Sequence, residues 1–254
     1  RRRHTRSLCD WSSDVCSSDL QKNLIYLSMK EKKLVYFPSL SSGAYASPLT
    51  KDMEVAPGVP YRFWDDRVPE EWRYKYFLMT AGHLYKKSEI RKTWGLEDSL
   101  VFGDSGGFQI ATGALKWDMA LRDQIFEWLE ANSDIACNID IPPRVAYEGR
   151  FQEALDISLD NFKYFEKKQS GKTNFLNVIQ GSNPVEFKHW YNTVKGLEFG
   201  GWCFGSSRRL VDFMYILALM LKEKEFNNKN NTWVHLLGIS KVSDFFVLAQ
   251  MQKL

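Results

Sequence analysis

The sequence is short of cysteine, of long apolar runs and of any excess of one charge. Four cysteines among 254 residues are too few for a small disulfide-stapled secreted scaffold. The longest apolar run, residues 213–221, is well below the roughly 20 residues that a membrane-spanning helix needs. The net charge of +3 creates no general attraction to nucleic acid, although a local basic patch is compatible with it. We therefore expect a globular protein without a membrane anchor.

The first twenty residues differ from the rest of the chain. They begin with basic residues but contain no apolar segment, so they do not form a signal peptide. They also lack the periodicity of a helix or a strand. We interpret residues 1–20 as translated sequencing-adapter sequence without structure and assign the fold to residues 21–254. The two cysteines outside this stretch, Cys137 and Cys203, have no CxxC spacing, and such reduced thiols without a leader indicate a cytoplasmic protein.

From residue 76 onward, short apolar runs alternate with stretches of helical periodicity. Asp118 is a suitable N-cap for one such stretch, in which Leu121, Ile125 and Leu129 recur with helical spacing. Expected strands lie at 34–37, 76–79, 100–102, 135–139, 175–179, 199–204 and 233–237. Expected helices lie near 88–94, after Asp118, at 151–165, from Pro184 onward, at 210–223 and at 243–254. From residue 76, strand–helix units of ~25–30 residues predict a parallel sheet covered by helices.

Two architectures fit this alternation, an open doubly wound sheet and a (β/α)8 barrel. An open sheet gathers its ligand-binding residues at one switch point, whereas a barrel distributes them over the ends of successive strands. Here polar residues and glycines follow the strands one after another, at Asp104, Asp140, Gln180, Gly201 and Gly238. We therefore predict an α/β fold, a (β/α)8 TIM barrel that is incomplete at the C-terminus because the last helix stops at the final residue.

The segment GDSGGFQ, residues 103–109, follows one of these strands. Paired glycines let a backbone approach a flat ligand and offer N–H groups to it. Asp104 is a candidate general acid or base, and Phe108 is a candidate for stacking on an aromatic ring. The alternative is a structural turn that Asp104 caps, and the bare pattern favours neither.

The segment NIDIPP, residues 138–143, places Asp140 at the end of the next strand. The two prolines that follow predict a rigid, non-helical loop. A carboxylate offers two acceptors that match the adjacent N1–H and N2–H donors of guanine. A helix-capping aspartate is the alternative, and it is favoured if this segment is taken alone.

Three further segments complete the pattern. Gln180 follows a strand in VIQG, where its amide can donate and accept hydrogen bonds. Gly200 and Gly201 form a second glycine pair, with close packing of strand and helix as the alternative reason for them. Leu237 in HLLGIS is a candidate lid opposite Phe108. Together these segments describe a slot for a planar purine with both faces covered.

The order of these motifs and the residues in them resemble the motifs of the tRNA-guanine transglycosylase superfamily, whose members exchange a guanine for a 7-deazaguanine. Its most specific string, DSGGFQ, is present unchanged, and the resemblance covers roughly residues 76–254. It implies a TIM barrel in which Asp104 is the proton acceptor and Asp140 reads the base. The residues for which it implies substrate contact are Ser105, Gly106, Gly107, Phe108, Gln180, Gly200, Gly201, Leu237 and Gly238. It implies contact with nucleic acid for Lys241 and Asp244.

The resemblance also implies partners and a metal. The partners are tRNA or DNA, free guanine or 7-deazaguanine, and a second copy of the chain in a homodimer, with no membrane among them. The family's catalytic nucleophile, a second aspartate, and its structural zinc ligands are expected after Leu254. We therefore expect no metal or other cofactor within this chain, and no base exchange by this chain alone.

The sequence departs from the family pattern in three places. Residues 81–84, AGHL, replace a tyrosine–histidine motif, Ser182 replaces a glycine, and His235 replaces an aromatic residue. These departures favour a divergent branch of the superfamily, which includes enzymes that modify DNA rather than tRNA. A non-catalytic partner subunit is the alternative from a different class, and the two intact aspartates argue against it. Arg208 and Arg209 are further candidates for phosphate contact, although an ordinary surface pair is favoured.

Overall fold

The computed structural model describes residues 34–40, 54–60, 62–205, 209–227, 233–239 and 241–251. All of them belong to one compact unit, Leu34–Leu254. The interpretation of residues 1–20 and the candidate Arg208 therefore lie outside the described residues.

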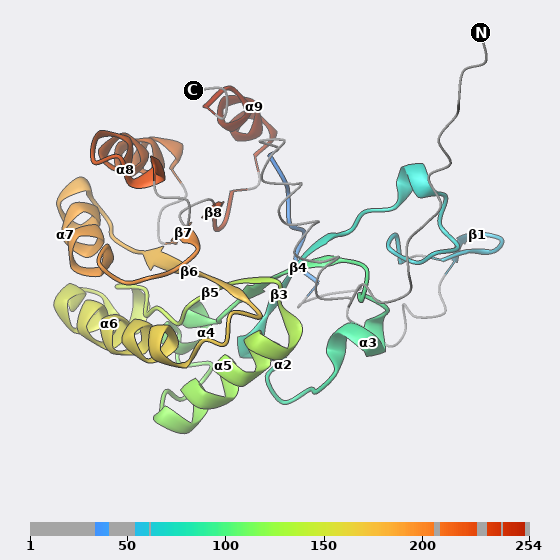
Figure 1. Ribbon diagram of the computed structural model, residues 1–254, viewed down its shortest axis with the longest axis horizontal. Helices are drawn as coiled ribbons and strands as arrows, with labels where there is room; N and C mark the ends of the chain where they lie inside the picture. The colour runs from blue at the N-terminus through green and yellow to red at the C-terminus, as the bar shows by residue number, and fades with distance from the viewer. Residues whose placement is uncertain are drawn as a thin grey trace, which may run out of the picture. The chain divides into compact units, whose positions relative to one another are not determined.

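The fold is built on a parallel sheet of six strands whose spatial order follows the sequence (Figure 1). Each strand pairs in parallel with the next one along the chain, and the sheet curls into a half-barrel. The strands are β3 (Tyr76–Thr80), β4 (Leu100–Asp104), β5 (Ile135–Cys137), β6 (Asn174–Ile179), β7 (Gly201–Phe204) and β8 (Trp233–Leu236). An antiparallel pair, β1 (Glu54–Ala56) and β2 (Val59–Pro60), precedes them. The predicted parallel α/β architecture is confirmed.

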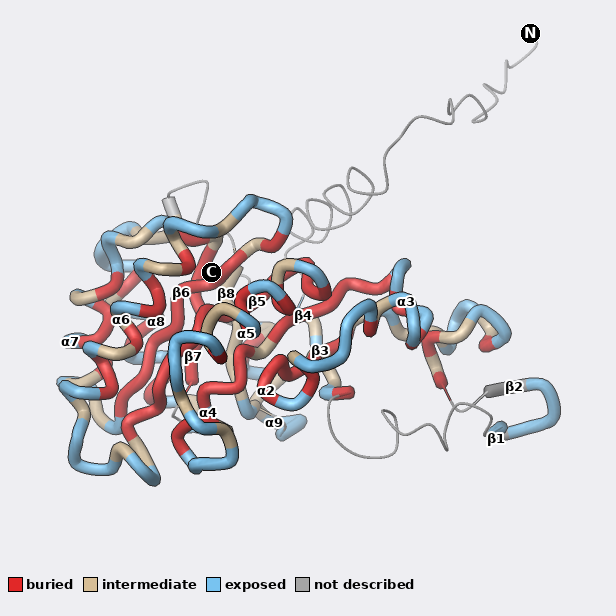
Figure 2. The backbone as a smooth tube through the Cα atoms, turned by 90° about the horizontal axis from the view of Figure 1, so that it is seen from below, coloured by how far each residue is buried: buried red, intermediate tan, exposed pale blue. Residues whose placement is uncertain are grey.

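Helices connect the strands, and the four long ones after β4 lie along the outer face of the half-barrel (Figure 1). The helices are α2 (Ala81–Leu84), α3 (Ile90–Trp94), α4 (Gly107–Ala111), α5 (Met119–Asn132), α6 (Phe151–Lys168), α7 (Pro184–Val194), α8 (Leu210–Lys222) and α9 (Val242–Met251). Strands β4 to β7 are buried almost throughout, whereas the outer sides of the helices are exposed (Figure 2). At Gly103 a Cβ atom would meet Ser133 Oγ at 2.3 Å, so Gly103 faces the helical layer and its neighbour Asp104 faces the inside of the half-barrel.

Two predicted helix starts are confirmed by their capping bonds. Asp118 Oδ1 accepts a hydrogen bond from the backbone N–H of Leu121 at 2.7 Å. Asn183 Oδ1 accepts from Val185 and Glu186 at 3.0 Å each. Pro184 occupies the first turn of α7, where its missing N–H leaves no bond unmade.

Some predicted boundaries are wrong. Residues 34–37 do not form a strand; the segment 34–40 makes a single parallel bridge with β3, between Ser39 and Leu78. The strand expected at 135–139 ends at Cys137, because the side chain of Asn138 accepts the hydrogen bond of Val178 N at 3.3 Å in place of a backbone carbonyl.

Aromatic side chains fill the inside of the half-barrel below the strand ends. Phe37 lies within 6.1 Å, between ring centroids, of Phe102 on β4 and of Trp233 and His235 on β8. His235 also stacks on Phe102 with the ring centroids 3.8 Å apart. Burial in this cluster lowers the pKa of His235 to about 3, so the ring is neutral at pH 7. The cluster joins strands that are not neighbours in the sheet.

The apolar run at 213–221 lies on α8, where some of its side chains are buried and others are exposed. Phe213, Ile216 and Met220 are buried, as the helical spacing predicts. Met214 and Leu221 are exposed. Among the described residues, no helix is both long and apolar enough to cross a bilayer.

Candidate active site

Asp104 and Asp140 lie at the carboxyl ends of neighbouring parallel strands, facing the inside of the half-barrel. Asp104 is the last residue of β4, and Asp140 is three residues beyond the end of β5. Carboxyl ends of parallel strands meet at one edge of the sheet, and this is the edge at which such folds bind ligands. The negative charge of Asp104 contributes to raising the pKa of Asp140, so the two carboxyl groups are electrostatically coupled. The structure thus brings together the two aspartates that the sequence singled out.

Three groups surround the carboxyl of Asp104. Thr80 Oγ1 donates to Oδ2 at 3.0 Å, the backbone N–H of Gly106 donates to Oδ1 at 3.2 Å, and Cys137 Sγ lies 3.8 Å from Oδ1. Burial raises the pKa of Asp104, and these three hydrogen bonds oppose the rise. A raised pKa makes the protonated form of this carboxyl easier to populate, as a general acid requires.

Asp140 is more deeply enclosed than Asp104. It is 4% exposed, and Gln180 Nε2 donates a hydrogen bond to its Oδ2. Burial raises the pKa of Asp140 to about 7, assisted by the charge of Asp104 and opposed by the Gln180 bond and by the positive charge of Arg144. The loop that carries Asp140 is fixed to α6, because Ile141 N donates to Ser158 Oγ at 2.8 Å.

The glycines of the first motif pack against the site itself. Gly106 has φ +90, and a Cβ atom there would lie 2.7 Å from the Cα of Gly82. A Cβ atom on Gly107 would lie 2.1 Å from the carbonyl oxygen of Asp140. Ser105 between this pair and Asp104 is fully buried. These glycines therefore let α4 begin directly against the loop that carries Asp140.

The second glycine pair of the predicted slot packs within the sheet, against neighbouring strands, and not between a strand and a helix as the alternative reading of the sequence had it. Cβ atoms at Gly200 and Gly201 would collide with Asn174 Oδ1 and with the carbonyl oxygen of Trp233. Gly205, which the sequence did not single out, is confined by Gln180, whose Nε2 would lie 2.0 Å from a Cβ there.

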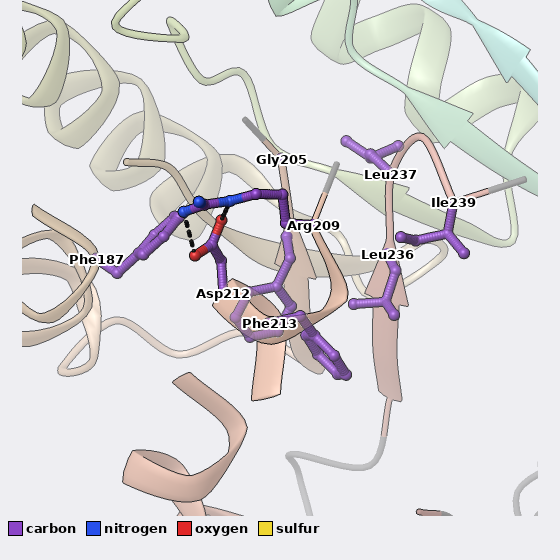
Figure 3. A pocket seen from close by; sticks show the side chains of 9 residues that line it. Phe187, Gly205, Arg209, Asp212, Phe213, Leu236, Leu237 and Ile239 are labelled. Atoms are coloured by element: carbon purple, nitrogen blue, oxygen red, sulfur yellow. Dashed lines mark hydrogen bonds and ion pairs between the residues drawn. The ribbon is translucent and has the colours of Figure 1, made fainter. Parts of the chain in front are cut away.

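Phe108 and Leu237 lie in different surroundings. Phe108 is 48% exposed, and the guanidinium of Arg144 lies over its ring, 5.1 Å from the centroid. Leu237 instead lines a pocket between β7, β8 and α8, in which Arg209 and Asp212 face one another (Figure 3). The residues that line it are Phe187, Phe204, Gly205, Arg209, Asp212, Phe213, Leu236, Leu237 and Ile239. Its volume of about 10 Å³ is room for about one water molecule, and neither Phe108 nor Asp140 lines it.

The candidates for nucleic-acid contact lie at the beginning of α9 and α8. Lys241 is exposed, Asp244 is partly exposed in the first turn of α9, and Gly238 is exposed with φ +78. Arg209 forms two hydrogen bonds with Asp212, at 2.7 and 2.8 Å. The side chain of Arg209 is nevertheless 66% exposed.

Sequence reasoning missed four residues of the site. Thr80 and Cys137 contact Asp104, and Arg144 contacts Phe108. Cys203 is buried inside the half-barrel, and burial together with its neighbour Cys137 raises its pKa well above the usual value. The nearness of Thr80 to Asp104 could have been predicted from the sequence, because Thr80 ends the strand that directly precedes the strand ending at Asp104. Nothing in the sequence around Arg144 indicates that its guanidinium would lie over the Phe108 ring.

This geometry defines a class of protein, an α/β half-barrel with two carboxyl groups of raised pKa at the carboxyl ends of neighbouring strands. No model of a known protein family matches the chain. A search of curated proteins finds no similar sequence either. Within the described ranges, no three His, Cys, Asp or Glu side chains gather as a metal site. The resemblance places its zinc ligands after Leu254, so that expectation stays a prediction, and no chemistry is assigned to the metal.

Proposed function

We propose that this protein is a base-exchange glycosyltransferase that replaces guanine in tRNA with a 7-deazaguanine, and that its half-barrel belongs to a (β/α)8 TIM barrel. The observation that carries the proposal is the placement of Asp104 and Asp140, a half-buried and a buried carboxyl group that are electrostatically coupled at the carboxyl edge of the sheet. The resemblance at DSGGFQ suggests the class of reaction. The geometry offers Asp140 for recognition of the base and Asp104 for proton transfer.

Asp140 is suited to reading the base. Its carboxylate can accept the two neighbouring donors of a guanine edge, and Gln180 holds one of its oxygens in place. Burial strengthens such charged hydrogen bonds because water does not compete for them. A ligand that supplies two donors would also stabilise the charged form of a carboxyl whose pKa is about 7 in the free protein.

Asp104 is suited to moving a proton. Its pKa is raised by burial, and general acid–base groups work best when the pKa lies near the working pH. Exchange with retained geometry also requires a covalent anchor for the ribose, and the resemblance assigns that anchor to a different aspartate. Base recognition and proton transfer are therefore the steps that the described residues support.

Calorimetric titration with free guanine and a free 7-deazaguanine tests the base site. Asp140→Ala should weaken binding by about 30- to 1000-fold, because the loss of a charged acceptor leaves two purine donors unpaired, at about 2–4 kcal/mol. Adenine, which lacks the N1–H donor, should bind poorly to the unmodified protein. Asp160→Ala, which removes an exposed carboxylate on α6, is the matched control. Equal affinities of the unmodified protein and the Asp140 variant would refute the assignment.

The same exchange on DNA is the second candidate, favoured by the departures at Ser182 and His235 from the family pattern. Incorporation of radiolabelled guanine into tRNA and DNA by the full-length protein, measured side by side, separates the two substrates. A non-catalytic partner subunit would bind nucleic acid without binding the free base, so the calorimetric result distinguishes that alternative. A second copy of the chain remains the proposed oligomeric partner.

A further inference from the structure

A hydrogen bond links the ends of two neighbouring strands at the acid–base aspartate. Thr80 ends β3 and is the register partner of Asp104 at the end of β4. Its Oγ1 lies 3.0 Å from Asp104 Oδ2, and the residue is 5% exposed. Because a β-branched side chain has few rotamers on a strand, this bond holds the carboxyl group in one orientation.

The two oxygens of Asp104 meet chemically different partners. Oδ1 accepts the backbone N–H of Gly106 at 3.2 Å. A backbone N–H can only donate, so it disfavours a proton on Oδ1. A hydroxyl group both donates and accepts, so Thr80 can bond with Oδ2 whether or not Oδ2 carries a proton.

Other titratable groups also act on this carboxyl. Cys137 on β5 lies 3.8 Å from Oδ1. His83 on α2 favours the charged form of Asp104, and the charge of Asp104 in turn disfavours the charged form of Asp140. Of all these groups, Thr80 is the one that bonds with Oδ2 in the described structure.

We propose that Thr80 is a positioning residue that fixes the plane of the Asp104 carboxyl and reserves Oδ2 as the oxygen that gains and loses the proton. Thr80 donates to Oδ2 while the carboxylate is charged and accepts from Oδ2 when the carboxyl is protonated. Only the catalytic use of this proton rests on the proposed function, because the hydrogen-bond pattern itself is independent of any substrate.

Carbon-13 NMR titration of protein labelled at the aspartate carboxyl groups tests this role, with Asp104→Asn identifying the resonance. Thr80→Val keeps the shape of the side chain and removes the hydroxyl, so it should raise the pKa of Asp104 by about 0.5–1 because the carboxylate loses a donor. Thr80→Ser keeps the hydroxyl and should restore the original pKa to within about 0.2, on the same principle. Thr112→Val is the matched control, because the Thr112 hydroxyl bonds only to backbone carbonyls at the end of α4 among the contacts described.

An unchanged pKa of Asp104 in Thr80→Val would overturn the proposal, as would an equal rise in Thr80→Ser. If Thr80→Val does not fold, Thr80→Ala supplies the same loss of the hydroxyl. The Thr80→Val substitution could raise the pKa of Asp104 even if the unmodified protein binds neither guanine nor a 7-deazaguanine. That combination would support the positioning role and count against the proposed function. The two ideas therefore fail separately.

Discussion

The Asp140 carboxyl has a pKa of about 7 in the folded chain, whereas an unfolded aspartate titrates near about 4. Between these values the folded chain binds a proton that the unfolded chain does not. The stability that this proton contributes is complete below about pH 4 and is lost as the pH rises through about 7. At neutral and higher pH the buried carboxylate therefore destabilises the fold. Under the proposed function, recognition of a base with two donors would be the reason to retain it.

Asp140→Asn should remove this penalty. The variant should have a free energy of unfolding about 2–4 kcal/mol above that of the unmodified protein at pH 8, with the difference shrinking toward pH 4. Urea unfolding at a series of pH values measures it. Asp160→Asn, which alters an exposed carboxylate, is the control. A difference that does not change with pH would contradict the raised pKa.

Arg144 covers the aromatic face that a stacked base would use. Its guanidinium lies 5.1 Å from the centre of the Phe108 ring, within the range of centroid separations that aromatic stacking requires. Arg144→Ala should therefore strengthen the binding of free guanine by about 3- to 10-fold, because a base no longer has to displace a cation–π contact of roughly 1 kcal/mol. Calorimetry measures the change.

Arg150→Ala is the matched control for this prediction. Arg150 lies in the same connection and covers Tyr147, with the guanidinium 4.7 Å from the ring centroid. It should leave guanine affinity unchanged. Weaker binding in Arg144→Ala would mean that Arg144 does not compete with the base, and that it supports binding by contacting the base or by favouring the charged form of Asp140.

At the scale of elements, α4 and the loop after β5 are joined by a glycine contact. In Gly107→Ala the new Cβ would lie 2.1 Å from the carbonyl oxygen of Asp140, closer than any real contact. The helix or the loop must shift, which should lower the free energy of unfolding by about 1–3 kcal/mol and weaken base binding. Urea unfolding and calorimetry measure the two effects.

Gly196→Ala provides the comparison, because a Cβ atom at Gly196 would meet nothing within 4 Å. Its free energy of unfolding should stay within about 0.5 kcal/mol of the original. Equal effects of the two substitutions would show that Gly107 does not hold α4 against the Asp140 loop.

Elements with local signals were predictable from sequence, and elements that depend on distant contacts were not. Asp118 and Asn183 mark helix starts through bonds to residues two or three positions away, so the sequence alone reveals them. The short helix α2 has four residues, too few to establish a period. The expected strand at 34–37 failed because a strand needs a partner, and only Ser39 pairs with β3.

The candidate site divides in the same way. Asp104 and Asp140 were predictable, because parallel strands bring the residues after their ends to one edge. The contact of Arg144 with Phe108 was not, because it depends on the path of the loop after Asp140. The expected pairing of Phe108 with Leu237 across a slot stays a prediction. In the described structure, Leu237 lines a pocket that Phe108 does not share.

At the scale of the whole fold, Phe37 joins the two ends of the six-stranded sheet. It contacts Tyr76 on β3, at one end of the strand order, and Trp233 on β8, at the other. The segment that carries it is held on β3, where Leu40 N donates to Leu78 O at 2.9 Å. The curvature that gathers the strand ends around the carboxyl pair is thus supported by a residue outside the sheet.

Phe37→Ala should therefore weaken the association of β8 with the rest of the half-barrel. Phe37 is 7% exposed, and loss of a buried phenylalanine costs about 3–5 kcal/mol of unfolding free energy. Because the lost contacts bridge strands that do not pair, backbone amides of Trp233–Leu236 should lose more protection from hydrogen exchange than those of β5. Urea unfolding and residue-resolved hydrogen exchange measure these effects.

Tyr36→Ala separates bridging from simple loss of an aromatic ring in the same segment. Tyr36 is 49% exposed and contacts Phe245 on α9. Its backbone carbonyl, which accepts the hydroxyl bond of Tyr74, survives the substitution. This variant should lose roughly 1 kcal/mol or less and leave the exchange of the β8 amides unchanged. If Phe37→Ala lowered protection equally in β5 and β8, Phe37 would stabilise the fold only by its volume, and the curvature of the sheet would have to come from the strands and helices themselves.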